Sequence, residues 1–113
     1  MTIIIQNKWF CKLFKINGIT LYPFIIVNDK DNKILINHEK IHIVQQSELY
    51  VIPFYFLYFK WYFENRKNFK GFYLIKHYWS YRNIPFEVEA FSNQSNLDYL
   101  RTRKPKSYRK YLK

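Results

Sequence analysis

Cysteine is nearly absent from this chain of 113 residues, and its scarcity excludes two classes of protein. Cys11 is the single cysteine, so no internal disulfide can form and no Cys-x-x-Cys pair can bind a metal or carry out redox chemistry. A chain without disulfides suits a reducing compartment, and we therefore expect a cytoplasmic protein. Cys11 itself is expected to be a small, buried hydrophobic residue.

Long apolar runs are also lacking. The longest, LYVIPFYFLYF at residues 49–59, is too short to cross a bilayer core, which requires about 20 residues. The three isoleucines at positions 3–5 are too few for the apolar part of a signal peptide. The sequence therefore predicts neither a membrane span nor a signal peptide, and it leaves peripheral contact with a membrane open.

Acidic residues are scarce. Eight Asp and Glu stand against 19 Lys and Arg, which gives a net charge of +11, and seven of the basic residues lie between Arg101 and Lys113. We expect one domain over residues 1–100 and a frayed basic tail over residues 101–113. Such a tail could bind an anionic partner, either the phosphates of nucleic acid or an anionic membrane surface. The chain carries no named nucleic-acid-binding motif.

Glycine occurs only twice, and the few turn signals divide the chain into strands and helices. The β-branched and aromatic residues of positions 3–27, together with KILI at 33–36, predict two or three strands. The glycine-free stretch that follows predicts a helix, with Asn37 as its N-cap and Pro53 as an interruption. A second helix is expected from Pro85 to Tyr99. The pattern predicts an α+β fold, in which a short antiparallel sheet packs on two helices.

The stretch INHEKIH contains the motif H-E-x-x-H, formed by His38, Glu39 and His42. Residues four apart on a helix lie one turn apart on the same face, so the two imidazoles can bind one Zn²⁺. Glu39 lies about 100° around the helix, where it can act as a general base toward a water molecule. The motif therefore indicates metal-assisted hydrolysis, usually of a peptide bond.

A catalytic zinc site needs a third protein ligand. Glu48 has the spacing of a metzincin ligand, but those sites require glycine where this chain has Gln45, so the continuing helix should carry Glu48 off the histidine face. Glu87 and Glu89, in PFEVEAF, are two residues apart and cannot share a face. Ala90 lies three residues after Glu87, and its small side chain would let this helix approach the metal-bearing helix closely. Glu87 is therefore the expected third ligand.

The combination of H-E-x-x-H with a later E-x-x-A, here FEVEA, resembles the gluzincins, which are zinc peptidases of the thermolysin type. Residues 35–91 are also similar to short, uncharacterised bacterial zincin-like proteins. The resemblance implies a small zincin-like domain in which His38, His42 and Glu87 bind Zn²⁺ and Glu39 is catalytic.

Other residues are candidates for supporting roles. Many gluzincins place an aspartate four residues after the ligand glutamate, where it orients a histidine, whereas this chain has Phe91. Gln45 or Asn37 would then have to orient a ligand instead. His77 and Tyr81 could donate hydrogen bonds to an oxyanion, and His77 is a further candidate for the metal.

Three functional hypotheses follow. The leading one is a zinc-dependent metallopeptidase or hydrolase with a peptide or protein substrate. The alternative is a non-catalytic binding module of the same fold, which uses its basic tail and the aromatic residues 49–63 to contact nucleic acid or an anionic membrane surface. In the third, the motif is accidental and the protein is structural. The aromatic stretch itself could supply core, a substrate groove, a dimer interface or a membrane contact.

Overall fold

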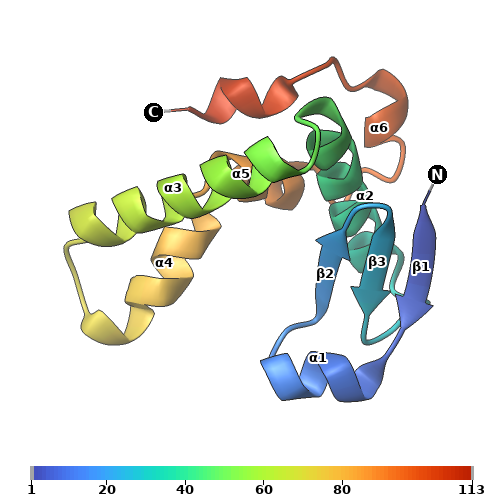
Figure 1. Ribbon diagram of the computed structural model, residues 1–113, viewed down its shortest axis with the longest axis horizontal. Helices are drawn as coiled ribbons and strands as arrows, with labels where there is room; N and C mark the ends of the chain where they lie inside the picture. The colour runs from blue at the N-terminus through green and yellow to red at the C-terminus, as the bar shows by residue number, and fades with distance from the viewer. Residues whose placement is uncertain (1, 113) are drawn as a thin grey trace.

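The computed structural model describes residues 2–112, and within them the chain has an α+β fold of a three-stranded sheet and six α-helices (Figure 1). The elements, in chain order, are β1 (Ile3–Gln6), α1 (Lys8–Phe14), β2 (Gly18–Leu21), β3 (Phe24–Val27), α2 (Lys33–Glu48), α3 (Ile52–Asn68), the 3-10 helix η1 (Tyr73–Ile75), α4 (Lys76–Arg82), α5 (Pro85–Asn93), α6 (Tyr99–Thr102) and the 3-10 helix η2 (Ser107–Tyr111).

The sheet is mixed, so the expectation of an antiparallel sheet is wrong for its first strand. The strand order is β1-β3-β2, with β2 antiparallel and β1 parallel to β3. The first apolar stretch does not continue as a strand, because Asn7 ends β1 and caps α1 by accepting a hydrogen bond from the backbone N–H of Phe10 at 2.9 Å. The tight β2–β3 hairpin then leaves β2 at one edge of the sheet.

Helix α2 begins earlier than the sequence predicts. Its N-cap is Asn32, whose side chain accepts a hydrogen bond from the backbone N–H of Leu35, so KILI forms the first helical turn and not a strand. A short apolar run fits a buried helix as well as a strand, which is why its pattern misled. Asn37 is not a cap. It lies inside α2, and its amide donates to the backbone carbonyls of Gln94 and Asn96 at 2.8 and 3.0 Å.

The predicted interruption at Pro53 is confirmed. Helix α2 ends at Glu48, and α3 starts at Ile52 with Pro53 in its first turn. Within α3 only Phe54 is fully buried, where it packs against Phe86 and Ile84 in the main hydrophobic core. No helix in the described part of the chain is long and apolar enough to cross a membrane.

The expectation of a frayed tail is wrong for residues 101–112. Helix α5 ends at Asn93, short of the predicted Tyr99, and the chain then returns across α5 as η2. Tyr108 is 4% exposed, and its ring packs on Phe86 with the centroids 4.7 Å apart. Arg103 is also buried and forms ion pairs within the fold. The segment is therefore fastened to the core by the side chains of Arg103 and Tyr108, although most of its other residues are exposed.

Candidate metal centre

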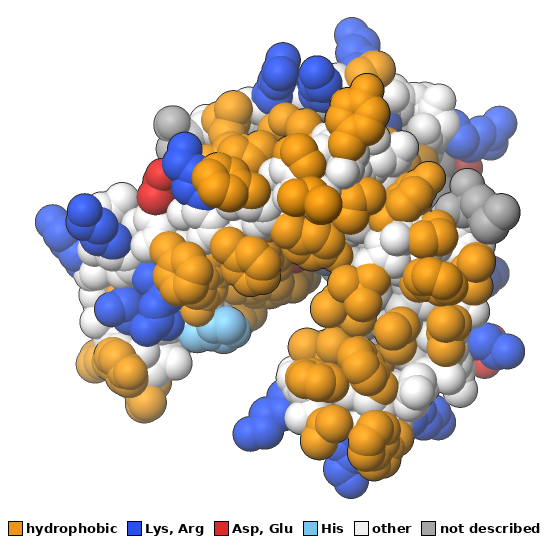
Figure 2. Space-filling model, in the orientation of Figure 1, with side chains coloured by type: hydrophobic (Ala, Val, Ile, Leu, Met, Phe, Trp, Pro, Cys, Tyr) orange, Lys and Arg blue, Asp and Glu red, His pale blue; other side chains and the backbone are white. Residues whose placement is uncertain are grey.

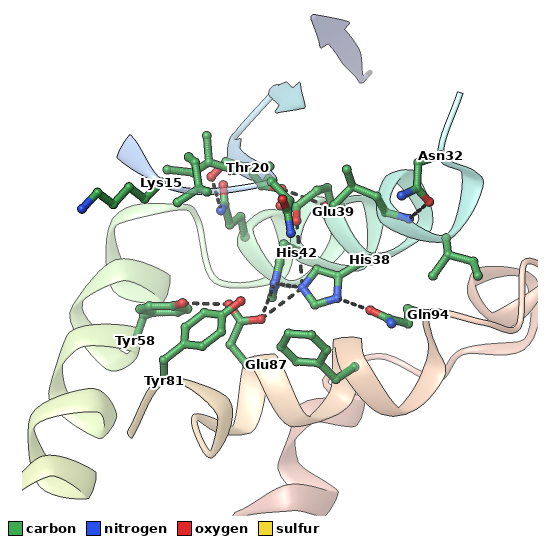
Figure 3. A pocket seen from close by; sticks show the side chains of 18 of the residues that line it. Lys15, Thr20, Asn32, His38, Glu39, His42, Tyr58, Tyr81, Glu87 and Gln94 are labelled. Atoms are coloured by element: carbon green, nitrogen blue, oxygen red, sulfur yellow. Dashed lines mark hydrogen bonds and ion pairs between the residues drawn. The ribbon is translucent and has the colours of Figure 1, made fainter. Parts of the chain in front are cut away.

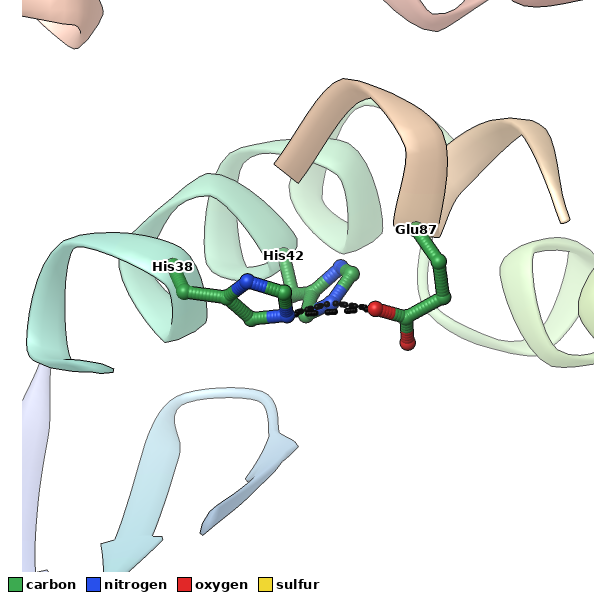
Figure 4. Close-up of side chains that lie close together, drawn as sticks. All are labelled: His38, His42 and Glu87. Carbon is green, nitrogen blue, oxygen red and sulfur yellow. Dashed lines mark hydrogen bonds and ion pairs between the residues drawn. The ribbon is translucent and has the colours of Figure 1, made fainter. Parts of the chain in front are cut away.

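Helices α2 and α5 bring together two histidines and a glutamate (Figure 4). The Nε2 atoms of His38 and His42 are 3.2 Å apart, and each lies 3.1 Å from Oε1 of Glu87. The two histidines come from successive turns of α2, and Glu87 comes from the first turn of α5. All three side chains are buried. Glu89 points away from them, as the spacing predicts, and Ala90 is fully buried on α5.

The spacing of the three atoms fits a metal ion. Ligand atoms around a four-coordinate zinc, with bonds of about 2.0–2.1 Å, lie about 3.3–3.4 Å from one another. The observed separations of 3.1–3.2 Å are within a few tenths of an ångström of those values. His38, His42 and Glu87 can therefore hold three corners of a tetrahedron and leave the fourth open.

Hydrogen bonds indicate which nitrogen of His42 carries a proton. The amide nitrogen of Gln45 donates to the Phe86 carbonyl and to Glu89, so its Oε1 must face His42, at 2.7 Å from Nδ1. Nδ1 is therefore the donor, and Nε2 presents its lone pair to the centre when the ring is neutral. Gln45, which the sequence analysis named as a residue that could orient a ligand, thus contacts His42 directly.

Three acceptor atoms so close together require a cation among them, either a proton or a metal ion. Burial alone would lower the pKa of His42, but the Glu87 carboxylate against the ring raises that pKa to about 9. Burial would likewise raise the pKa of Glu87, and the two imidazoles hold it well below its usual range instead. The centre is therefore built around positive charge.

Glu39 lies beside this centre but outside the group of three. One carboxylate oxygen accepts a hydrogen bond from the Thr20 hydroxyl at 2.8 Å, and the other is 3.9 Å from Nε2 of His38. Burial raises the pKa of Glu39, although both histidines and the Thr20 hydroxyl oppose the shift. A buried carboxylate with a raised pKa is a stronger base than an exposed one.

The centre lies at the bottom of a cavity of about 700 Å³ (Figure 3). Strand β2 and helix α2 line one side, and α3, α4 and α5 line the other. Tyr81 projects into it from α4, and burial together with the nearby Glu87 carboxylate raises the pKa of its hydroxyl, which keeps its proton. His77 also lines the cavity, but it is exposed, lies outside the metal-binding group and contacts the Tyr62 hydroxyl at 2.7 Å.

Three residues near the centre were not predicted from the sequence. Gln94 accepts a hydrogen bond from Nδ1 of His38 at 2.8 Å, Tyr58 donates to Oε2 of Glu87 at 2.7 Å, and Thr20 binds Glu39. Phe91 packs edge-on against the His38 ring, with the ring centroids 4.6 Å apart. The side chain that contacts Nδ1 of His38 is that of Gln94, about one helical turn after Phe91.

A buried ionic network lies behind the centre. Glu89 receives hydrogen bonds from Gln45, from Tyr99 and from the Arg103 guanidinium, which also contacts Glu48 at 3.0 Å. Burial alone would raise the pKa of Glu89, but the hydrogen bonds from Arg103, Gln45 and Tyr99 lower that pKa below its usual value. Glu48, the rejected metzincin-type ligand, is part of this network.

Comparisons with known proteins add no relative. No protein-family model matches the chain, and neither a curated protein nor a solved structure is significantly similar to it.

Proposed function

We propose that this protein is a zinc-dependent hydrolase of the metallopeptidase type. The observation that carries the proposal is the convergence of His38, His42 and Glu87, with Glu39 directly beside them. Two imidazoles and one carboxylate are a donor set that suits a catalytic zinc site with one open position. The resemblance of the two motifs to the gluzincins supports the same reading.

In the proposed hydrolysis of an amide bond, each residue near the centre has a separate role. Bound zinc would act as a Lewis acid and lower the pKa of water to about 7. Glu39 takes a proton from the attacking water and passes it to the leaving amine. The Thr20 hydroxyl, 2.8 Å from Glu39, fixes the orientation of that carboxylate. The Tyr81 hydroxyl, which keeps its proton, is placed to donate to the oxyanion of the tetrahedral intermediate.

The cavity suits an extended peptide. The edge strand β2 lines it, and a peptide could pair with that edge. The pairing is restricted to the start of β2, because the Thr20 carbonyl already accepts hydrogen bonds from Gln46 and Tyr55 at 3.0 and 2.7 Å. In the antiparallel ladder Ile19 pairs with Ile26 of β3, so a substrate could pair through its backbone with Gly18 but not with Ile19. The aromatic residues of α3 and α4 that line the cavity would contact the side chains of the substrate.

Elemental analysis tests the proposal most directly. The purified protein should contain one zinc per chain, and His42→Ala should lose it, because a ligand is gone and Glu87 is left unpaired. His77→Ala is the matched control and should keep its zinc, since His77 lies outside the metal-binding group. The wild-type protein should also cleave members of a broad peptide library. The assignment would be contradicted if the wild-type protein held no zinc after incubation with zinc ions. It would also be contradicted if His42→Ala and His77→Ala held equal amounts of zinc.

A further inference from the structure

One side of α3 is apolar and exposed. Ile52, Phe56, Phe59 and Phe63 follow a spacing of four, three and four residues, which places them in one line along the helix, the α3 stripe. Their exposed fractions are 78, 70, 55 and 62%. The opposite side of α3 packs on the core through Phe54. A helix that only covers a core would carry mainly polar residues on its outer side, whereas the middle of the outer side of α3 is this apolar line.

A second exposed apolar group lies at the turn between α3 and α4. Phe72, Tyr73, Leu74 and Ile75, the η1 tip, are consecutive and are 83, 76, 92 and 51% exposed. Four exposed apolar residues in a row are typical of a binding surface. Figure 2 shows that apolar side chains spread over the face formed by α3, the β2–β3 hairpin and α1, with Lys and Arg around its edge.

The elements of this face are strongly basic. Residues 8–15 and 52–78 together contain eight Lys or Arg and a single acid, Glu64. Glu64 is itself paired with Lys60 at 3.8 Å. Lys60 and Lys67 follow the α3 stripe along one flank, as their helical positions require. Apolar residues bordered by lysines are the pattern by which proteins bind the interface of an anionic bilayer.

We propose that this face binds the surface of an anionic lipid bilayer, with the α3 stripe and the η1 tip inserted at the level of the headgroups. Two copies would have to bring faces of equal positive charge together, which disfavours a dimer. Nucleic acid would leave Ile52, Leu74 and Ile75 without a partner, because aliphatic side chains do not stack on bases. A bilayer satisfies the apolar and the basic groups at once.

The surface also borders the cavity. Tyr78, which is 62% exposed, and Lys15 belong to the elements of this face and also line the cavity, so the face reaches the edge of the cavity. Bilayer binding does not depend on the proposed hydrolase activity. The Glu39→Gln variant should therefore bind vesicles as the wild type does, whichever result the catalytic test gives.

Vesicle co-sedimentation of the full-length chain tests the proposal. Wild type should bind vesicles that contain about 30 mol % phosphatidylglycerol in phosphatidylcholine at least about tenfold more strongly than pure phosphatidylcholine. Phe56→Gln/Phe63→Gln should weaken that binding by about tenfold or more. Leu97→Gln/Leu112→Gln removes two exposed apolar residues outside the face and is the matched control, which should bind normally. Circular dichroism and thermal unfolding verify that both variants fold.

Three results would overturn the proposal. The first is equal binding, or none, on anionic and neutral vesicles. The second is a wild-type protein that binds no vesicles but is retained on DNA, with the same retention in the Phe56→Gln/Phe63→Gln variant. The third is a dimer by light scattering that the same substitutions dissociate, again without vesicle binding.

Discussion

At the scale of single residues, the contacts of each buried glutamate decide its chemistry. Glu87 lies between two imidazoles, so it stays an anion and suits a cation. Glu89 faces Arg103 and is also held as an anion, but in a structural ion pair. Glu39 has the Thr20 hydroxyl as its close partner, and burial raises its pKa. Of the three, Glu39 is the one whose surroundings make it a base.

The substitution Glu39→Gln should separate catalysis from metal binding. Glutamine keeps an oxygen that can accept the Thr20 hydrogen bond, so the fold should persist, but it cannot take up a proton. We expect kcat/KM to fall by about 10²–10⁴, while the zinc content stays at one per chain. The measurement is peptide cleavage beside elemental analysis.

The exposed glutamate of α3 provides the control for that substitution. Glu64→Gln makes the same chemical change at a side chain that is 53% exposed and paired only with Lys60. Its activity should equal that of the wild type. Full activity in Glu39→Gln would show that another group is the base.

At the scale of elements, the C-terminal segment fastens α5 to α2. Arg103 contacts Glu89 on α5 and Glu48 at the end of α2, and Tyr108 packs on Phe86 of α5. Glu89 in turn fixes Gln45, which orients His42. The basic segment, which the sequence predicted to be a free tail, is therefore linked through Glu89 and Gln45 to the position of His42.

This network predicts a stability that depends on pH. The pKa of Glu89 is lowered in the folded state, so its contribution is fully present above the ordinary carboxyl value of 4.5 and is lost as the pH falls below it. At pH 7, Glu89→Gln should reduce the free energy of unfolding by about 2–4 kcal/mol, because a buried ion pair is broken while Glu48 still contacts Arg103. Urea unfolding at several pH values measures both effects.

The difference between wild type and Glu89→Gln should shrink as the pH drops from 4.5 toward the lowered pKa of Glu89 in the folded protein, because over this range the unfolded wild-type chain takes up a proton that the folded chain does not. A difference that stays constant from pH 7 to acid would mean that Glu89 does not titrate as a paired anion. Glu64→Gln, at an exposed surface pair, should change the free energy of unfolding by less than about 1 kcal/mol.

At the scale of the whole molecule, the cluster of His38, His42 and Glu87 joins the two helices that carry most of the buried polar residues. Without a metal ion, a proton on His42 is the cation left to hold these three atoms within 3.2 Å of one another. Removal of zinc with a chelator should therefore lower Tm by about 10 °C or more. Differential scanning calorimetry of metal-loaded and chelated protein measures this shift. His42→Ala should have the same Tm with and without the chelator. If the Tm of the wild type did not change with the chelator either, the protein would hold no metal that stabilises it.

The local parts of this structure could be predicted from the sequence. Helix geometry alone places His38 and His42 on one face with Glu39 beside it, and the two-residue spacing of Glu87 and Glu89 separates their directions. Proline lacks a backbone N–H, which is why Pro53 was expected to interrupt the helix. The α+β class followed from the change of pattern along the chain, and the structure confirms it.

Tertiary structure alone decided the rest, because the remaining features depend on partners distant in the chain. KILI is helical because Asn32 caps it and α2 packs on the sheet, and β1 is parallel because β3 takes the middle of the sheet. The Arg103 side chain is buried because it forms ion pairs with Glu89 and Glu48. The basic residues around it in the sequence do not indicate these distant partners. Local sequence sets helical faces and turns, whereas burial of a charge is set by which distant side chains fold against it.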